Sequence, residues 1–206
     1  MLRERSKELT VNHFDKTAKN YDNSSDGKFV QCMYQEILDR AEKIPAKRIL
    51  DLGCGNGNAI ALLRDRIPAE YYGLDISENM IEEARIRLGK AVSFSVGDAE
   101  HLPYENQTFD LIICNASFHH YPGPGMAVKE MKRVLKPGGT IILGDPTIKW
   151  KILVPIFDWL IKFTPSGDAK VWHKDDITVL FQENGFRVEQ FKYLNQHAFM
   201  FNAVIR

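Results

Sequence analysis

The sequence predicts an α/β fold built on a doubly wound, mostly parallel sheet. Between residues 48 and 143, short apolar runs alternate with amphipathic segments of helical spacing. The connections between them are short, and strands joined through helices in this way pair in parallel. Residues 109–114 are almost continuously apolar, which is typical of a strand buried on both faces of a parallel sheet.

The composition is that of an ordinary globular chain. Its 206 residues are 44% hydrophobic and 26% charged, which suits one domain with a sizeable core. Acidic and basic residues balance at 27 each, so no nucleic-acid partner is expected. The three cysteines are far apart, which favours reduced thiols and a cytoplasmic location. We expect no signal peptide and no transmembrane segment, because no apolar run is long enough.

The first 45 residues are expected to form a helical lid. Residues 25–44 carry apolar side chains at helical spacing, and Pro45 ends the pattern. The polar stretch before it, residues 14–22, carries two regularly placed aromatics, Phe14 and Tyr21. Taken alone, this stretch is either a frayed leader whose aromatics patch the core or a segment with a functional role.

The most informative stretch is residues 48–58. An aliphatic run ends on Asp51, and Gly53, Gly55 and Gly57 follow at alternate positions. Glycine allows positive φ and lets the backbone approach a ligand closely. Apolar residues at helical spacing come next, so we expect a buried strand, a tight turn and a helix whose N-terminal amides face the turn. Such a turn in an α/β sheet usually holds a nucleotide-like ligand.

Strands and helices alternate after the turn. Ser77 is expected to cap a helix that Gly89 ends. The Lys-Pro-Gly-Gly of residues 136–139 is expected to break an amphipathic helix ahead of a fifth strand, residues 140–143. The second, third and fourth strands are expected at residues 71–75, 92–96 and 109–114.

The last third of the chain departs from this alternation. Residues 150–163 carry an apolar stripe that is typical of a helix or a helical pair. Residues 175–184 are expected to form a helix with Gly185 as its C-cap. Residues 186–193 and 198–205 are separated by a short polar turn, so they must pair antiparallel at one end of the sheet.

A single domain is therefore expected over the whole chain, residues 1–206. Its parts are an N-terminal helical lid, a ligand-binding core, an inserted helical cap, and a C-terminal helix with a β-hairpin. These parts span residues 1–45, 46–146, 147–173 and 174–206.

Acidic residues at the ends of three successive strands narrow the choice of ligand. Asp51, Asp75 and Asp98 would line one edge of the sheet, where open α/β sheets bind ligands. A carboxylate at Asp75 can accept both hydroxyls of a ribose, or it is simply a charge at a helix N-terminus. A dinucleotide-binding turn reads G-x-G-x-x-G, whereas Asn58 stands where its third glycine would be. The lysine and hydroxyl residue of a Walker-type phosphate loop are missing too.

The turn resembles the Asp/Glu-x-Gly-x-Gly-x-Gly motif of class I S-adenosylmethionine-dependent methyltransferases. The F-D-x-x-A-x-x-Y-D pattern of residues 14–22 is similar to the leader of their type 11 group, which includes ubiquinone and menaquinone biosynthetic C-methyltransferases. Residues 98–104, 108–112 and 133–140 are similar to further blocks of that group. The resemblance covers roughly residues 14–145 in the expected order.

The resemblance implies a seven-stranded Rossmann-like sheet in the order 3-2-1-4-5-7-6, with the last strand antiparallel. It implies S-adenosylmethionine as cofactor and S-adenosylhomocysteine as product. Asp51 would pair with the cofactor's ammonium or organise the turn, and Asp98 would contact the adenine amino group. Cys54 is expected to be structural and not a nucleophile. The expected cofactor-binding residues are Tyr21, Asp51, Gly53, Cys54, Gly55, Gly57, Asp75, Ile76, Met80, Asp98, Ala99 and Asn115.

Methyl transfer is an in-line displacement, so the protein mainly has to align nucleophile, methyl group and sulfur. A general base helps when the nucleophile is a hydroxyl or an acidic carbon. His119 and His120 follow the fourth strand, where this family meets donor and acceptor, and are the expected catalytic residues. Alternatively, one of them only orients the loop. No metal site is expected, because no third ligand appears at convincing spacing.

The sequence thus predicts a methyltransferase that acts on a small molecule, as a monomer or homodimer. The cap, residues 147–173, would cover the acceptor, pack on the core or form a dimer surface. An NAD(P)-dependent oxidoreductase is disfavoured by Asn58 and by residues 136–139. A non-catalytic module that binds the cofactor stays open as a second alternative. Neither the acceptor nor the atom that is methylated follows from the sequence.

Overall fold

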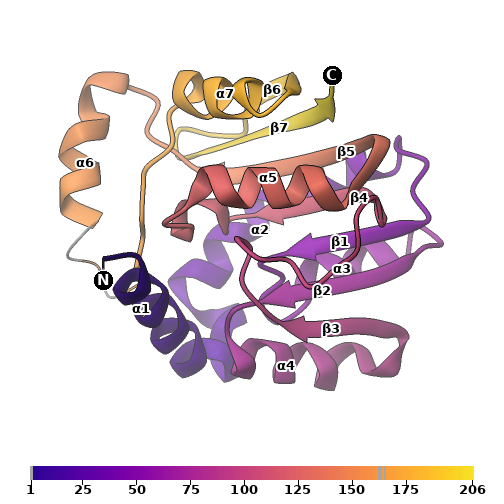
Figure 1. The fold of residues 1–206 in the computed structure, drawn as a ribbon. Helices are drawn as coiled ribbons and strands as arrows, with labels where there is room; N and C mark the ends of the chain where they lie inside the picture. Colours follow the sequence, from indigo (N-terminus) through magenta and orange to yellow (C-terminus); the bar gives the residue numbers. More distant parts are fainter. Residues whose placement is uncertain (1, 162–163, 165) are drawn as a thin grey trace.

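Seven strands form one sheet within residues 2–161, 164 and 166–206, the part of the chain that the computed structural model describes. The strands are β1 (Arg48–Leu52), β2 (Glu70–Asp75), β3 (Val92–Val96), β4 (Phe109–Asn115), β5 (Leu135–Pro146), β6 (Phe186–Tyr193) and β7 (Ala198–Ile205). Their order is β3-β2-β1-β4-β5-β7-β6 (Figure 1). The first five strands pair in parallel, and β7 is antiparallel to β5 and β6. The expected order and directions are confirmed.

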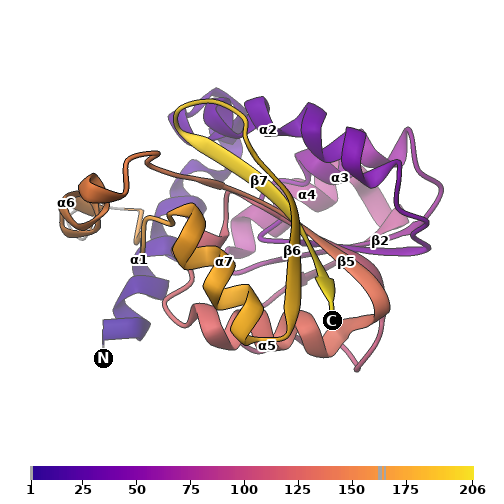
Figure 2. The ribbon, with the colours of Figure 1, turned by 90° about the horizontal axis from the view of Figure 1, so that it is seen from above.

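Helices cover both faces of the sheet. The α-helices are α1 (Leu2–Thr17), α2 (Ser25–Ala41), α3 (Asn58–Arg64), α4 (Glu78–Leu88), α5 (Pro124–Val134), α6 (Val154–Leu160) and α7 (Lys174–Glu183). The 3-10 helices are η1 (Ala18–Asn23), η2 (Gly89–Ala91), η3 (Phe118–His120) and η4 (Lys151–Leu153). One core lies between the sheet and α5 and α7, and the other between the sheet and α2, α3 and α4 (Figure 2). α1 lies at the end of the molecule where β1, β2 and β3 end (Figure 1).

β4 shows why the apolar run of residues 109–114 forms a central strand. Successive side chains of a strand point to opposite faces. Leu111 and Ile113 accordingly join the core under α2, whereas Ile112 and Cys114 join the core under α5. All four side chains are fully buried. A strand that is apolar on both faces is stable only in the middle of such a three-layer arrangement.

The helix after β2 begins and ends as the sequence predicts. The Ser77 side chain accepts a hydrogen bond from the backbone N–H of Met80 and so caps α4. Gly89 follows the last turn with φ +63, a conformation that favours glycine.

The predicted break at residues 136–139 lies inside β5 and not before it. Leu135 already pairs with Phe109, and parallel pairing resumes at Thr140 after a register shift. The four residues between are a bulge in the ladder, with Gly138 at φ +77. Pro137 has no N–H to donate and is tolerated in an irregular part of a strand. The fifth strand therefore begins earlier than predicted.

The N-terminal segment is ordered, so the interpretation of residues 14–22 as a frayed leader is wrong. α1 runs directly into η1, and α2 follows after Ser24. The Ser24 side chain accepts a hydrogen bond from the N–H of Gly27 and so caps α2. α2 ends at Ala41, four residues before the predicted stop at Pro45.

The cap contains η4 and α6, and most of its apolar stripe faces outward. Ile152 is 84% exposed and Trp159 is 60% exposed, so these side chains do not pack on the core. Trp172, in contrast, is buried with its ring centroid 5.3 Å from that of Phe118. Phe163, a further aromatic residue of the predicted apolar segment, lies outside the described residues. None of the described helices is long and apolar enough to cross a membrane.

Candidate functional site

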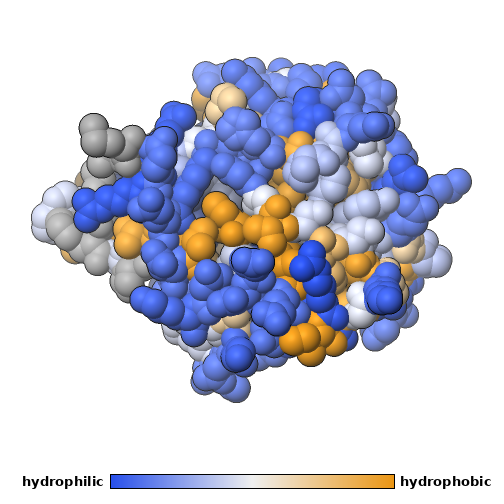
Figure 3. All heavy atoms as spheres, turned by 60° about the horizontal axis from the view of Figure 1, so that its bottom comes forward, coloured by the Kyte–Doolittle hydropathy of each residue, from blue (hydrophilic) through white to orange (hydrophobic). Residues whose placement is uncertain are grey.

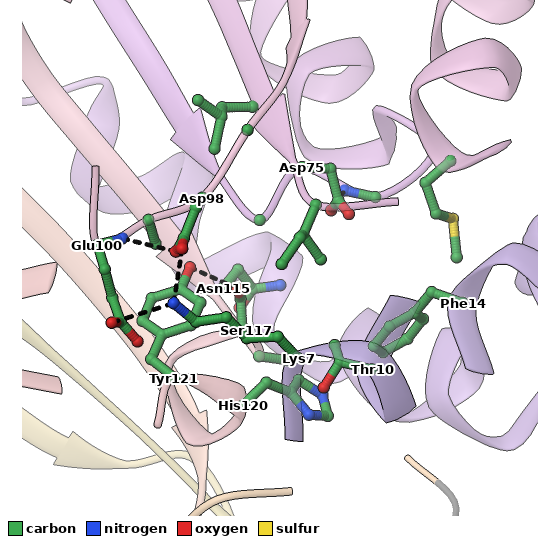
Figure 4. A pocket seen from close by; sticks show the side chains of 18 of the residues that line it. Lys7, Thr10, Phe14, Asp75, Asp98, Glu100, Asn115, Ser117, His120 and Tyr121 are labelled. Carbon is green, nitrogen blue, oxygen red and sulfur yellow. Dashed lines mark hydrogen bonds and ion pairs between the residues drawn. The ribbon is translucent and has the colours of Figure 1, made fainter. Parts of the chain in front are cut away.

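The ends of the parallel strands surround a cavity with about 700 Å³ of empty space. Its walls come from the glycine turn, from the ends of β2, β3 and β4, and from α1, which lies across it (Figure 4). We call this cavity the turn cavity. On the face of the molecule that carries α1 and α4, hydrophobic residues gather in a band across an otherwise hydrophilic surface (Figure 3).

The three glycines of the turn meet different requirements. Gly53, Gly55 and Gly57 all have positive φ, at +72°, +51° and +81°. A Cβ on Gly53 would lie 1.9 Å from the Ser117 Oγ, whereas a Cβ on Gly57 would touch the Leu88 side chain of α4. A Cβ on Gly55 would meet nothing within 4 Å, because this residue borders the cavity. Gly53 and Gly57 therefore have no room for a side chain, whereas Gly55 leaves its side of the turn open to the cavity.

Asp75 holds the turn in place from the end of β2. One carboxylate oxygen accepts the N–H of Gly55 at 2.8 Å, and the other accepts the N–H of Ser77 at 2.9 Å. Burial raises the pKa of Asp75, and these backbone donors partly offset that effect. The side chain also lines the turn cavity, together with Ile76 and Met80.

Asp51 is a buried carboxylate without a hydrogen-bond partner for its Oδ2 among the described residues. Burial and the nearby Asp75 raise its pKa to about 7. It borders a smaller cavity, of about 320 Å³, which shares Tyr21, Gly55 and Asn115 with the turn cavity. An unpaired carboxylate at this depth suits a cationic ligand group, since a buried charge is costly without a partner.

Asp98 lies two residues after the end of β3 and is already paired with a lysine from α1. Lys7 Nζ lies 2.6 Å from Asp98 and 3.1 Å from Glu100 (Figure 4). Asp98 also accepts the backbone N–H of Glu100. Nothing in the sequence indicated that Lys7 would reach this edge, because the contact spans 91 residues.

The leader is held over the turn by a cluster of hydrogen bonds around Asp22. Its carboxylate accepts from the side-chain amides of Asn56 and Asn58, each at 2.7 Å, and from Arg87 at 2.8 Å. Burial acts to raise the pKa of Asp22, but these donors lower it to about 2. We call this cluster the Asp22 latch. The cluster gives a structural role to Asn58, the residue that departs from the dinucleotide motif. It also places Tyr21 against the glycine turn.

A second cavity, with about 600 Å³ of empty space, adjoins the turn cavity. The two share Phe14, Tyr21, Ala116 and His120. We call it the histidine cavity, because His119 and His120 form its polar end beside Asp168. Its remaining lining residues are mostly apolar or aromatic: Phe14, Tyr21, Phe29, Val30, Ala116 and Pro146, with Asp26 and Ser166 as further polar residues.

The two histidines are held by different carboxylates. His119 Nδ1 lies 2.9 Å from an oxygen of the fully buried Asp145, and His120 Nδ1 lies 3.1 Å from Asp168. The ring centroids are 4.0 Å apart. Burial acts to lower the pKa of His119, but Asp145 and Asp168 outweigh it and the pKa is raised. Burial and the neighbouring His119 lower the pKa of His120 to about 4.

Most residues expected from the sequence border these cavities. The turn cavity is lined by Tyr21, Gly53, Gly55, Asp75, Ile76, Met80, Asp98, Ala99, Asn115 and His120. Asp51 and Cys54 border the smaller cavity, and burial raises the pKa of the Cys54 thiol, which suits a structural residue. Gly57 borders none of the three, and His119 borders the histidine cavity and a further cavity beside Thr147 and Lys170, but not the turn cavity.

Sequence reasoning missed three polar residues of the site: Lys7, Asp145 and Asp168. Asp145 had a usable signal, because it stands at the end of a predicted parallel strand, next to the end of β4. Lys7 and Asp168 had none, since each reaches the site from a segment far away in the chain.

Known proteins match this arrangement. A family model described as a methyltransferase domain matches residues 50–143. Demethylmenaquinone methyltransferase of Staphylococcus aureus (strain JH9) is 32% identical over 164 residues, which cover 68% of this chain and 67% of that protein. The chain belongs to the S-adenosylmethionine-dependent methyltransferase family. The cofactor of this family is the one that the sequence predicts.

Two further comparisons limit what family membership implies about this chain. Methyltransferase GfsG of Streptomyces halstedii is 35% identical to this chain over 122 residues, which cover 57% of the chain but only 44% of that protein. The chain thus spans less than half the length of this curated relative. A solved Haemonchus contortus phospholethanolamine N-methyltransferase 2, in complex with phosphomonomethylethanolamine and S-adenosylhomocysteine, has the same fold. Its TM-score is 0.74 at 15% identity, over 93% of this chain and 60% of that one.

The site fits the cofactor of the family. Asp51 offers an unpaired buried carboxylate for the ammonium of S-adenosylmethionine. The open side of Gly55 leaves room for close approach to the backbone. The carboxylates of Asp75 and Asp98 follow along the same edge, at the ends of β2 and β3, where the ribose and adenine groups would find acceptors.

Proposed function

We propose that this chain transfers a methyl group from S-adenosylmethionine to a small-molecule acceptor. The observation that carries the proposal is the pair of adjoining cavities. The turn cavity has the glycine turn and the acidic strand ends, and the histidine cavity has apolar walls and one polar end. Donor and acceptor would thus lie on either side of the shared residues Tyr21 and His120, which suits the in-line geometry of methyl transfer.

Different residues would bind different parts of the methyl donor. Asp51 would pair with the ammonium, Asp75 would accept the ribose hydroxyls, and Asp98 would accept the adenine amino group. Tyr21, held by the Asp22 latch, would cover the bound donor. Bound S-adenosylmethionine supplies a methyl group on a positively charged sulfur, and its transfer leaves the electron pair on sulfur and gives S-adenosylhomocysteine.

The acceptor residues prepare the nucleophile. Asp145 accepts the Nδ1–H of His119, which fixes the imidazole and leaves Nε2 as the basic atom. As the bond between the acceptor and the methyl carbon forms, Nε2 of His119 would take the acceptor's proton. The apolar walls of the histidine cavity favour an acceptor with an apolar or ring-containing body and one polar reacting group.

Product formation tests the proposal directly. The chain should release S-adenosylhomocysteine from S-adenosylmethionine in the presence of at least one member of an acceptor library of phenols, hydroxy acids and amines. A thermal-shift assay should show stabilisation by S-adenosylhomocysteine and none by NAD(H). Stabilisation by the dinucleotide alone would overturn the proposal in favour of an oxidoreductase. Cofactor binding with no turnover on any acceptor would favour a non-catalytic module instead.

Two further expectations stay predictions. The chain is expected to act as a monomer or homodimer, and size-exclusion chromatography with light scattering would decide between them. A cytoplasmic location, expected from the spacing of the cysteines, awaits localisation of the tagged protein.

A further inference from the structure

His119, His120 and Asp168 bring three potential metal ligands together in a buried place. Their ligand atoms all lie within 4.8 Å of one another. Asp168 Oδ1 is 3.1 Å from His120 Nδ1 and 3.7 Å from His119 Nε2. Ligand atoms that share one ion at bond lengths of about 2.0–2.2 Å lie roughly 3.0–3.5 Å apart. The two distances from Asp168 are therefore close to those of a site formed around a metal ion, and the two histidine nitrogens lie within 4.8 Å of each other.

His120 is the least satisfied member of this group. Its side chain is only 10% exposed, yet its buried Nδ1 makes no hydrogen bond with the described residues. Asp168 Oδ1 forms an ion pair with this nitrogen at 3.1 Å, so the two atoms are close enough to bind one ion together.

The residues around the three ligands orient them as metal sites require. Asp145 lies 2.9 Å from His119 Nδ1, so that Nε2 is left as the ligand atom. The hydroxyls of Ser166 and Thr164 lie 2.8 and 3.1 Å from Asp168 Oδ2, and Oδ1 is the oxygen that contacts the two histidines. A carboxylate behind a histidine and hydroxyls behind a carboxylate are the usual outer partners of metal ligands.

The charge also matches. Asp145 is fully buried and contacts His119, and Asp168 is mostly buried and contacts both imidazoles. A third carboxylate that lines the cavity, that of Asp26, is paired with His13. Two carboxylates beside neutral imidazoles carry two negative charges, which one divalent cation would neutralise. Imidazole nitrogens favour zinc, iron, cobalt and nickel over magnesium and calcium, which prefer oxygen ligands.

We propose that His119 Nε2, His120 Nδ1 and Asp168 Oδ1 bind a divalent transition-metal ion, with Asp145 as a positioning residue. Asp168 is the third ligand that the sequence did not reveal. The remaining coordination positions would face the histidine cavity, because all three ligands line it. Three protein ligands with an open position are typical of catalytic zinc sites.

The catalytic consequence rests on the proposed function, whereas binding of the ion does not. An Nε2 that ligates a cation cannot also take a proton. The ion would instead bind a hydroxyl of the acceptor and lower its pKa, so that the O–H bond breaks and its proton passes to solvent water. The oxygen would then bond to the methyl carbon while the bond from that carbon to sulfur breaks and leaves its electron pair on sulfur. Methyl transfer to a hydroxyl acceptor would then require the metal.

Cobalt(II) is the probe for the experiment, because its visible absorption reports the ligands. The purified full-length chain, stripped of metal by a chelator, is titrated with Co²⁺ alone, without cofactor or acceptor. One Co²⁺ per chain should bind with a visible spectrum typical of nitrogen and oxygen ligands. Zn²⁺ should displace it, and Mg²⁺ should not. A wild-type chain that binds no Co²⁺, or that loses it equally to Mg²⁺, overturns the proposal.

Three variants locate the ion. Asp168→Asn keeps the side-chain shape but removes the charged ligand, and should abolish the visible spectrum. Asp145→Asn should weaken Co²⁺ binding by about 10–100-fold, the usual effect of an outer partner. His197→Ala removes an exposed imidazole from the β6–β7 turn and should bind Co²⁺ like the wild type. Unchanged binding by Asp168→Asn would overturn the site.

The same samples separate this proposal from the proposed function. Stabilisation by S-adenosylhomocysteine is measured on each variant by thermal shift, which also shows that the variant is folded. Cofactor binding without Co²⁺ binding would leave the proposed function intact and remove the metal site. Co²⁺ binding without cofactor binding would do the reverse.

Discussion

The turn cavity and the histidine cavity differ in what holds their polar groups. In the turn cavity, the Asp75 carboxylate is fixed by the backbone N–H groups of Gly55 and Ser77. In the histidine cavity, His119 is fixed by the side chain of Asp145, and Asp168 by the side chains of Ser166 and Thr164. The first set depends on the fold itself. The second depends on side chains that can be exchanged while the sheet stays intact, so the acceptor side can change within one fold more readily than the donor side.

The strongest test of this separation is His119→Ala. Loss of a group that takes a proton or binds a metal should lower kcat by about 10²–10⁴-fold. S-adenosylhomocysteine should bind as before, because His119 does not line the turn cavity. Steady-state kinetics and calorimetric titration measure the two effects. An equal loss of cofactor affinity would show that the two cavities are coupled.

The next test compares two glycines of the turn. Gly53→Ala should lower the free energy of unfolding by about 2–4 kcal/mol, from a positive φ and a Cβ pressed against Ser117. Gly55→Ala is the matched control, with the same backbone region but an open side, and should lower it by only about 1–2 kcal/mol. Urea unfolding gives both values. Equal losses would mean that contact between the new Cβ and Ser117 adds nothing to the destabilisation of Gly53→Ala.

Asp75→Ala addresses the donor side alone. Binding of S-adenosylhomocysteine should weaken by about 1.5–3 kcal/mol, the usual value for hydrogen bonds to a charged acceptor. Turnover at saturating cofactor should change less than the affinity does. An unchanged dissociation constant in a folded variant would exclude Asp75 from the site.

The smallest effect concerns pH and Asp51. In the free protein its pKa is raised to about 7, so it holds a proton below that pH. A bound ammonium favours the ionised form, hence affinity for S-adenosylhomocysteine should rise with pH, by at most about tenfold per unit, and level off above about pH 7. Asp51→Asn should remove most of this slope. Calorimetric titration across this range measures it, and a slope that persists in the variant would contradict the assignment.

The Asp51 carboxyl also makes the stability of the free protein depend on pH, in the direction opposite to its effect on cofactor affinity. A carboxyl whose pKa is higher in the folded than in the unfolded chain binds more protons when folded. Its contribution to the stability of the free protein therefore falls as pH rises from about 4 to about 7. Bound cofactor should flatten this decline, which thermal unfolding at several pH values would show.

The donor side could be predicted because its determinants are local. Asp51, Asp75 and Asp98 each lie at or within two residues of the end of a short strand that the sequence reveals by itself, and parallel strands bring their ends to one edge. The strands at residues 92–96, 186–193 and 198–205 match the prediction in full. Turn glycines, caps and apolar periodicity all act over a few residues, so one sequence is enough to find them.

The acceptor side could not be predicted to the same degree, because its contacts join distant segments. Asp168 reaches His120 across 48 positions, and Lys7 reaches Asp98 across 91. Such pairs leave no periodic signal. Asn58 shows a subtler limit: it was correctly taken as evidence against a dinucleotide, but its partner Asp22 was visible only in the structure.

The Asp22 latch has a consequence for kinetics. Tyr21 lies between the two cavities and is held there through its neighbour Asp22 by α3, α4 and the glycine turn. If the donor binds in the turn cavity as we propose, a cofactor that lies under Tyr21 would leave more easily when η1 moves aside, and this movement would break the three hydrogen bonds of the Asp22 latch. The residence time of the cofactor should then depend on the opening rate of the leader as well as on the cofactor's own contacts.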